Sequence, residues 1–167
     1  MSRIPRIVSV IGCSGSGKTT FIEGAIGECA RRGIAAAAIK KSRHAADLPP
    51  GAKDSSRFRA AGALPSIFLS GTVMVTLSPP PAAMDAGTIA ALCPGAEIVF
   101  CEGLAVPEAS ILLIAGDVRE EASLKRPLAD IALLAARAPD LRELAAARGI
   151  PAFAPDESGL IIDALFA

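Results

Sequence analysis

The sequence predicts an α/β fold whose central sheet is mostly parallel, and three observations support this prediction. A glycine-rich phosphate-binding pattern at residues 12–19 lies between an apolar run of strand length and a helix-like run. Strand-length and helix-length runs then alternate to the end of the chain. Two short β-rich runs are divided by one glycine, which is typical of a hairpin. We therefore expect a P-loop NTPase three-layer sandwich with a β-hairpin extension around residues 66–77.

Length and composition narrow the class of protein. At 167 residues the chain has the usual length of one domain, so residues 1–167 are expected to form a single nucleotide-binding domain. The 17 basic and 17 acidic residues balance, which argues against a nucleic acid or an anionic membrane as partner. No signal peptide or membrane span is recognisable, so a cytoplasmic location is expected. The four cysteines include no C-x-x-C pair, so neither zinc nor a dithiol site is indicated.

The elements of the first half follow from spacing and from helix-ending residues. Apolar residues recur at helical spacing over 17–32, and Gly33 lies where a helix end favours glycine, after a first strand at about 6–12. The apolar run 34–39 is too short for a helix, which gives a strand–helix–strand unit with a right-handed crossover. Residues 41–53 are polar and without periodicity, as in a functional loop. Asp54-Ser55-Ser56 offers helix N-cap chemistry before a helix expected at 57–61, closed by Gly62.

The second half reads as a hairpin followed by further strands and helices. The runs 66–70 and 72–77 predict a hairpin or an edge extension of the sheet. Around residue 130 helical and strand patterns compete. We prefer a strand there and a helix from Pro139, because proline is favourable at the first helical position. The remaining expected elements are a helix at 84–93 and strands at 97–101, 110–115 and 130–135; the run 150–153 and a last helix at 156–166 close the fold.

The strongest functional signal is the pattern Gly12-Cys13-Ser14-Gly15-Ser16-Gly17-Lys18-Thr19, with Thr20 after it. It matches the P-loop, whose backbone N–H groups surround phosphate oxygens while the lysine reaches the β- and γ-phosphates. The hydroxyl of Thr19 is expected to hold Mg²⁺. A plain glycine-rich turn is the weaker interpretation, because a strand precedes the pattern and a helix follows it. The expected ligand is a nucleotide, either GTP or ATP, with Mg²⁺.

Three residues outside the loop could complete the chemistry. Glu102 ends a buried run, where ligands gather in open α/β sheets, although a solvated loop glutamate is the alternative. Asp54 ends the polar loop, and its plain alternative is a helix N-cap. Lys40 could neutralise phosphate or be a solvated lysine at a strand end. The expected catalytic residues are Lys18, Asp54 and Glu102, and the expected metal-binding residues are Thr19, Glu102 and Asp54.

Two further observations limit what can be assigned. His44 is the one histidine, so a histidine metal cluster cannot form within one chain. The N-K-x-D pattern by which many GTPases hold guanine is absent, and Asp117 is a loose substitute for it. The base is therefore open between guanine and adenine.

Taken together, these residues resemble the molybdopterin-guanine dinucleotide biosynthesis adaptor proteins, the MobB family. The resemblance rests on GCSGSGKTT at 12–20, on Ile39-Lys40, on Lys53-Asp54-Ser55 thirteen residues past Lys40, on Arg59-x-Ala61-Gly62-Ala63, and on Glu102-Gly103. It implies a GTP-binding protein with weak hydrolysis, acting beside the enzyme that attaches GMP to molybdopterin. It also implies a homodimer to which the strands after the Ala-Gly-Ala segment contribute. By position, residues 12–20 would hold phosphates, Thr19 and Glu102 would serve Mg²⁺, and Asp54 would lie near the γ-phosphate.

The chain departs from the family pattern at three places. Lys41-Ser42-Arg43-His44 stands where relatives tend to be rich in histidine, Leu104-Ala105 replaces a Phe-Lys pair, and Ala135-Ala136-Arg137 replaces a polar pair ending in aspartate. These differences concern the base and the partner rather than the phosphates. The rival function is a small-molecule kinase or an ATP-dependent ligase of the dethiobiotin synthetase type, which would need an acceptor pocket for which a chain of this length leaves little room. A vestigial P-loop is disfavoured, because every fixed position is present.

Overall fold

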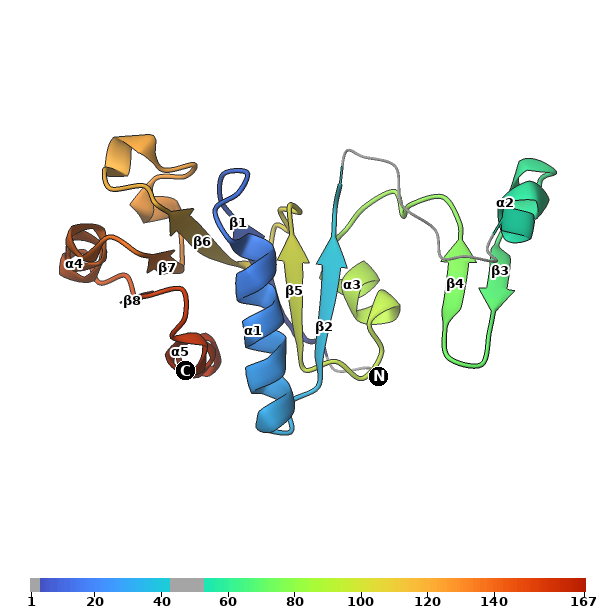
Figure 1. Ribbon diagram of the computed structural model, residues 1–167, viewed down its shortest axis with the longest axis horizontal. Helices are drawn as coiled ribbons and strands as arrows, with labels where there is room; N and C mark the ends of the chain where they lie inside the picture. The colour runs from blue at the N-terminus through green and yellow to red at the C-terminus, as the bar shows by residue number, and fades with distance from the viewer. Residues whose placement is uncertain (1–3, 43–52) are drawn as a thin grey trace. The chain divides into compact units, whose positions relative to one another are not determined.

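The computed structural model describes residues 4–42 and 53–167. The chain divides into two compact units. The main unit comprises Met1–Lys41 and Met84–Ala167, and the hairpin unit comprises Ser42–Ala83. Each unit has a sheet of its own (Figure 1). That both units act as a single nucleotide-binding domain stays a prediction.

The main unit is built on a six-stranded sheet in the order β2-β5-β1-β6-β7-β8. Every neighbouring pair in this sheet is parallel, as the alternation of strands and helices predicts. The carboxyl ends of the strands therefore share one edge, where β5 and β6 flank the end of β1. The strands are β1 (Arg6–Ile11), β2 (Ala36–Lys40), β5 (Ile98–Glu102), β6 (Ser110–Gly116), β7 (Leu133–Ala136) and β8 (Ala152–Phe153).

Helices cover both faces of this sheet, so the expected three layers are present. On one face, Val8 and Val10 of β1 share a buried cluster with residues of α1 (Lys18–Arg31) and α5 (Ser158–Phe166). On the other face, Ile7 packs with Ile89 of α3 (Ala86–Leu92). A third cluster joins β6 and β7 to α4 (Pro139–Ala147). No helix in the described part of the chain is long and apolar enough to span a membrane.

The boundary of one predicted strand needs correction. The strand expected at 130–135 is β7, Leu133–Ala136, and a 3-10 turn η2, Leu128–Asp130, takes up the residues before it. In that turn the amide of Asp130 donates to the carbonyl of Pro127 at 3.1 Å, which removes it from the strand ladder. A further 3-10 turn, η1, spans Glu121–Ser123. The predicted helix start at Pro139 is confirmed.

The hairpin unit contains α2 (Lys53–Ala60) and the antiparallel strands β3 (Ser66–Leu69) and β4 (Met74–Leu77). The predicted hairpin is thus confirmed, as a two-stranded sheet of its own. The Ser66 hydroxyl donates to the carbonyl of Ser55 at 2.7 Å and ties the hairpin to α2. The N-cap alternative for Asp54 is wrong, because α2 already includes Lys53 and Asp54 lies in its first turn. There its carboxylate accepts from Arg57 at 3.3 Å.

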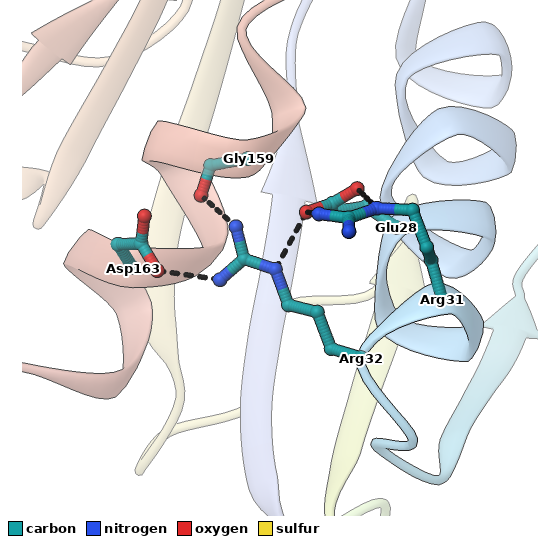
Figure 2. Close-up of polar contacts among 5 residues, drawn as sticks. All are labelled: Glu28, Arg31, Arg32, Gly159 and Asp163. Carbon is teal, nitrogen blue, oxygen red and sulfur yellow. Dashed lines mark hydrogen bonds and ion pairs between the residues drawn. The ribbon is translucent and has the colours of Figure 1, made fainter.

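An arginine at the end of α1 joins this helix to α5 (Figure 2). The guanidinium of Arg32 forms ion pairs with Glu28 and Asp163, and it donates to the carbonyl of Gly159 at 3.0 Å. Glu28 also pairs with Arg31 at 2.6 Å. Hydrogen bonds from Arg31 and Arg32 lower the pKa of Glu28 to about 2. Residues of the two helices, far apart in sequence, are therefore held together at this end of α1.

Replacing Glu28 should make the free energy of unfolding less dependent on pH in the acidic range. The pKa of Glu28 is about 2 in the folded protein, against 4.5 for an unperturbed glutamate. The stabilisation by Glu28 is therefore complete above the pKa of the unfolded state, and it is lost as the pH falls through the pKa of the folded state. In urea denaturation, Glu28→Gln should be less stable than wild type at pH 7, and the gap should shrink at pH 3. Glu23→Gln, exposed on the same helix, is the control. An equal gap at both pH values would contradict this role.

Candidate nucleotide site

The phosphate loop joins the end of β1 to the start of α1 and lies tightly against β6. A side chain at Gly12 would place its Cβ 2.3 Å from the carbonyl oxygen of Ile114, so only glycine fits there. Gly17, the residue before α1, has a φ of 92°, in the left-handed region that glycine tolerates. The glycines of the motif therefore have separate tasks, one in packing the loop and one in starting the helix.

The Lys18 side chain folds back and contacts the backbone of the phosphate loop. Its ammonium group donates to the carbonyls of Cys13, at 2.6 Å, and Gly12, at 3.2 Å. These acceptors are neutral, so the positive charge has no counter-charge from them. An approaching phosphate would offer the ammonium a stronger, charge-assisted partner.

Thr19, in the first turn of α1, contacts Glu102, the last residue of β5. In the register of β1 and β5, Val10 lies opposite Glu102, which brings the glutamate to the start of α1. The Thr19 hydroxyl is 2.9 Å from one carboxylate oxygen of Glu102 and 3.1 Å from the other. A hydroxyl and a carboxylate are the oxygen ligands that Mg²⁺ takes in nucleotide sites. The donor set thus fits a magnesium ion.

Lys40 completes this group from the other side of β5. It lies opposite Glu102 in the register of β2 and β5. Its ammonium group is 3.3 Å from a Glu102 carboxylate oxygen and 3.3 Å from the Thr19 hydroxyl. A positive charge therefore already lies beside the hydroxyl and the carboxylate that would hold a metal ion. Lys40 would have to move aside, or share Glu102, when a divalent cation binds.

The glycine after Glu102 fixes where β5 ends. Gly103 has a φ of +69°, and a Cβ on it would be 2.9 Å from the carbonyl oxygen of Lys41. The amide of Lys41 donates to the carbonyl of Glu102 at 2.9 Å. The Glu-Gly pair is thus a carboxylate followed by the residue that lets the ends of β2 and β5 approach each other.

Two cavities flank the loop in the main unit. The larger, about 790 Å³, is lined by Gly17, Thr20, Arg137 and Asp156 among others, and we call it the Thr20-side cavity. The smaller, about 430 Å³, is lined by Gly12, Ser14, Lys18 and Glu102 together with residues of other connections, and we call it the basic cavity. In a P-loop the lysine marks the β- and γ-phosphates, so the nucleoside would extend toward the Thr20-side cavity.

Sequence reasoning found Lys18 and Glu102 but missed other charged residues that line these cavities. Arg137 follows β7 and Asp156 follows β8, at the same sheet edge as Glu102. The strand-end rule that selected Glu102 could have found both. Asp117, the loose substitute for a base-reading residue, pairs with Arg137 at 3.0 Å. Lys125 and Arg126, which line the basic cavity, lie between two 3-10 turns and carry no local signal.

Most of the predicted site residues come together in the main unit. The loop, Lys40 and Glu102 form one site, as the contacts above show. Asp54 belongs to the hairpin unit, so its place near the γ-phosphate stays a prediction. His44 lies outside the described residues. The described residues contain no group of three histidine, cysteine or acidic side chains that could hold a metal without other ligands.

Comparison with known proteins fits this geometry. The family model described as Molybdopterin guanine dinucleotide synthesis protein B, MobB, matches residues 7–135. The chain belongs to this family. The match includes the phosphate loop, Lys40, Asp54 and Glu102. The resemblance that the motifs suggest is thereby confirmed.

Individual members of the family are more distant. The molybdopterin-guanine dinucleotide biosynthesis adapter protein of Haemophilus influenzae is 35% identical over 86 residues, 50% of this chain and 48% of that protein. The match thus spans about half the length of this curated relative. Bacillus subtilis MobB superposes with a TM-score of 0.70 at 20% identity, covering 95% of this chain and 97% of that one. A MobB homologue from Bacillus stearothermophilus gives 0.60 at 15% identity, with coverage of 95% and 97%. These two structures support the fold.

Replacing Gly12 by alanine should damage the loop. The added Cβ would lie 2.3 Å from the Ile114 carbonyl, and overpacking of this kind costs about 1–3 kcal/mol. Urea denaturation should show this loss for Gly12→Ala. Gly27→Ala is the control, because a Cβ there meets no described atom within 4 Å and alanine favours the helix. Wild-type stability of the Gly12 variant would show that the loop is not packed in this way.

Proposed function

We propose that this protein binds GTP with Mg²⁺ and serves as an adaptor in molybdopterin guanine dinucleotide synthesis, with slow hydrolysis of the nucleotide. The observation that carries the proposal is the contact of Thr19 with Glu102 beside the phosphate loop. Membership of the MobB family supports the pathway. GTP as the nucleotide, and the GMP-transferring enzyme as the partner, follow from the family resemblance. A cytoplasmic location belongs to the same proposal.

In this proposal each residue of the site has a defined task. Backbone N–H groups of residues 12–19 hold the phosphates, and Lys18 exchanges its loop carbonyls for the β- and γ-phosphates. Thr19 and Glu102 hold Mg²⁺, which neutralises phosphate charge when bound. Because Glu102 would hold the metal and pairs with Lys40 in its absence, it would not be free to act as a general base. Asp54 is the remaining carboxylate assigned near the γ-phosphate, by resemblance. Such a site suits retention of the nucleotide better than fast turnover.

The second function is transfer to a small molecule, by a kinase or by an ATP-dependent ligase. The basic cavity supports this second function, because an acceptor must bind beside the terminal phosphate and this cavity is lined by Lys18. At about 430 Å³, this cavity has the volume of a small-molecule pocket. The two functions differ in base preference and in stimulation by an acceptor, and both differences are measurable.

We also propose a homodimer that forms through the hairpin unit. In the register of the hairpin, Ile67 and Leu69 of β3 share a face with Met74 of β4. These three side chains are 53%, 73% and 65% exposed. Adjacent exposed apolar residues on a two-stranded sheet indicate a surface for another protein chain. A second copy is the proposed occupant, because the family resemblance places the dimer contact on these strands.

Nucleotide titration tests the main proposal. Wild type should bind Mg²⁺–GTP more tightly than Mg²⁺–ATP in calorimetry and release phosphate only over hours. Lys18→Ala should weaken GTP binding at least about tenfold, because a charge-assisted hydrogen bond contributes about 1.5–3 kcal/mol. Arg119→Ala, an exposed charge outside both cavity linings, is the control. Unchanged affinity in Lys18→Ala would remove the loop as the site. Tight ATP binding with acceptor-stimulated turnover would favour the transfer function.

Analytical ultracentrifugation tests the dimer. Wild type should sediment as a dimer at micromolar concentration, and Leu69→Lys should sediment as a monomer because the lysine charge would be buried in the contact. Leu92→Lys alters a residue that is 54% exposed on α3 of the main unit, and should leave the dimer intact. A monomeric wild type, or a dimeric Leu69→Lys, would contradict the hairpin contact.

A further inference from the structure

The basic cavity holds more positive charge than the phosphate loop supplies. Besides Lys18, three basic side chains line it, and they come from two connections on opposite sides of β1 and β5. Lys41 follows β2, and Lys125 and Arg126 lie between η1 and η2, in the connection from β6 to β7. Of the lining residues that the structure describes, Glu102 is the one that is acidic.

Among the described residues, these three charges have no acidic partner. In the described parts of the chain, neither Lys41 nor Lys125 nor Arg126 forms an ion pair. Glu102 offsets Lys40, at 3.3 Å, rather than any of the three. Clustered positive charges in a concave site raise the local concentration of anions and are stabilised by binding one. The cavity therefore carries a surplus of positive charge that would attract an anion.

The nucleotide does not account for this surplus. The nucleoside would extend toward the Thr20-side cavity, and among described residues the two cavities share no lining residue. The terminal phosphate and Mg²⁺ would lie along the part of the lining formed by the phosphate loop, Lys18 and Glu102, which leaves Lys41, Lys125 and Arg126. The volume of the basic cavity, about 430 Å³, is within the range of pockets that hold a small molecule, roughly 300–1,000 Å³. Room and charge therefore remain after the nucleotide is seated.

We propose that the basic cavity binds a second small molecule through a phosphomonoester group, next to the terminal phosphate of the nucleotide. This proposal rests on the proposed nucleotide function. Arg126 offers a planar fork that matches two phosphate oxygens, and Lys41 and Lys125 add point charges. Three cations suit a dianionic phosphate better than a singly charged carboxylate. Lys125 and Arg126 are the residues that hold this group without belonging to the phosphate loop.

Calorimetry with a defined probe tests the second site. The protein is first saturated with Mg²⁺ and the β,γ-imido analogue of whichever nucleotide binds more tightly, so that the terminal phosphate position is filled. Phenyl phosphate is then titrated, with benzoate as the singly charged comparison. Wild type should bind one phenyl phosphate per chain, and benzoate at least tenfold more weakly. The double variant Lys125→Gln/Arg126→Gln should lose tenfold or more in phenyl phosphate affinity while its nucleotide affinity stays within twofold. Arg119→Gln, from the same β6–β7 connection but outside the lining, should match wild type.

Each outcome separates the two proposals. Nucleotide binding without phenyl phosphate binding overturns the second site and leaves the nucleotide function standing. Loss of nucleotide affinity in the double variant, with phenyl phosphate affinity unchanged, shows that these residues serve the nucleotide, and it also overturns the second site. Equal binding of benzoate overturns the phosphomonoester assignment. Failure of wild type to bind any nucleotide overturns the proposed function and this inference together.

Discussion

The pairing of β1 with β5 is the constraint on which the site depends. Because the two strands are parallel and Val10 lies opposite Glu102, the carboxylate reaches the edge of the sheet where the phosphate loop begins α1. The contact of Glu102 with Thr19 follows from this register, and a slip of one residue would turn the side chain to the other face. On the opposite side of β5, the pairing with β2 brings Lys40 to the same carboxylate. The other neighbour of β1 is β6, and it restricts the first residue of the loop to glycine, because a side chain at Gly12 would meet the carbonyl oxygen of Ile114.

Charge is distributed unequally around this edge. The side of the loop next to Lys18 has basic residues from the connections after β2 and β6. The other side has Arg137 and Arg142 together with the acidic Asp156. A phosphate chain lying across the loop would thus have different surroundings at its two ends. The hairpin unit adds an exposed apolar face of its own, which belongs to association rather than to nucleotide chemistry in the functions proposed above.

Local patterns in the sequence predicted the core of this arrangement. The phosphate loop, its helix and the strand that ends in Glu102 could be predicted, because each has a pattern of a few adjacent residues. Their proximity could also be predicted, because a parallel sheet places the carboxyl ends of its strands at one edge. Lys125 and Arg126 were not readable, since they stand in an irregular connection and reach the loop only through tertiary packing. The N-cap alternative for Asp54 failed because helix boundaries shift by one or two residues without a strong end signal. The start of β7 moved because Pro127 begins a 3-10 turn that apolar periodicity does not reveal.

The central claim is that Thr19 and Glu102 form the magnesium site of a bound nucleotide. The most direct measurement is the affinity for a fluorescent GTP analogue in wild type and in Glu102→Gln, each with saturating Mg²⁺ and again with EDTA. The account predicts that Mg²⁺ tightens binding in wild type and that Glu102→Gln loses most of this gain while keeping its affinity in EDTA. An equal gain from Mg²⁺ in both proteins would contradict it.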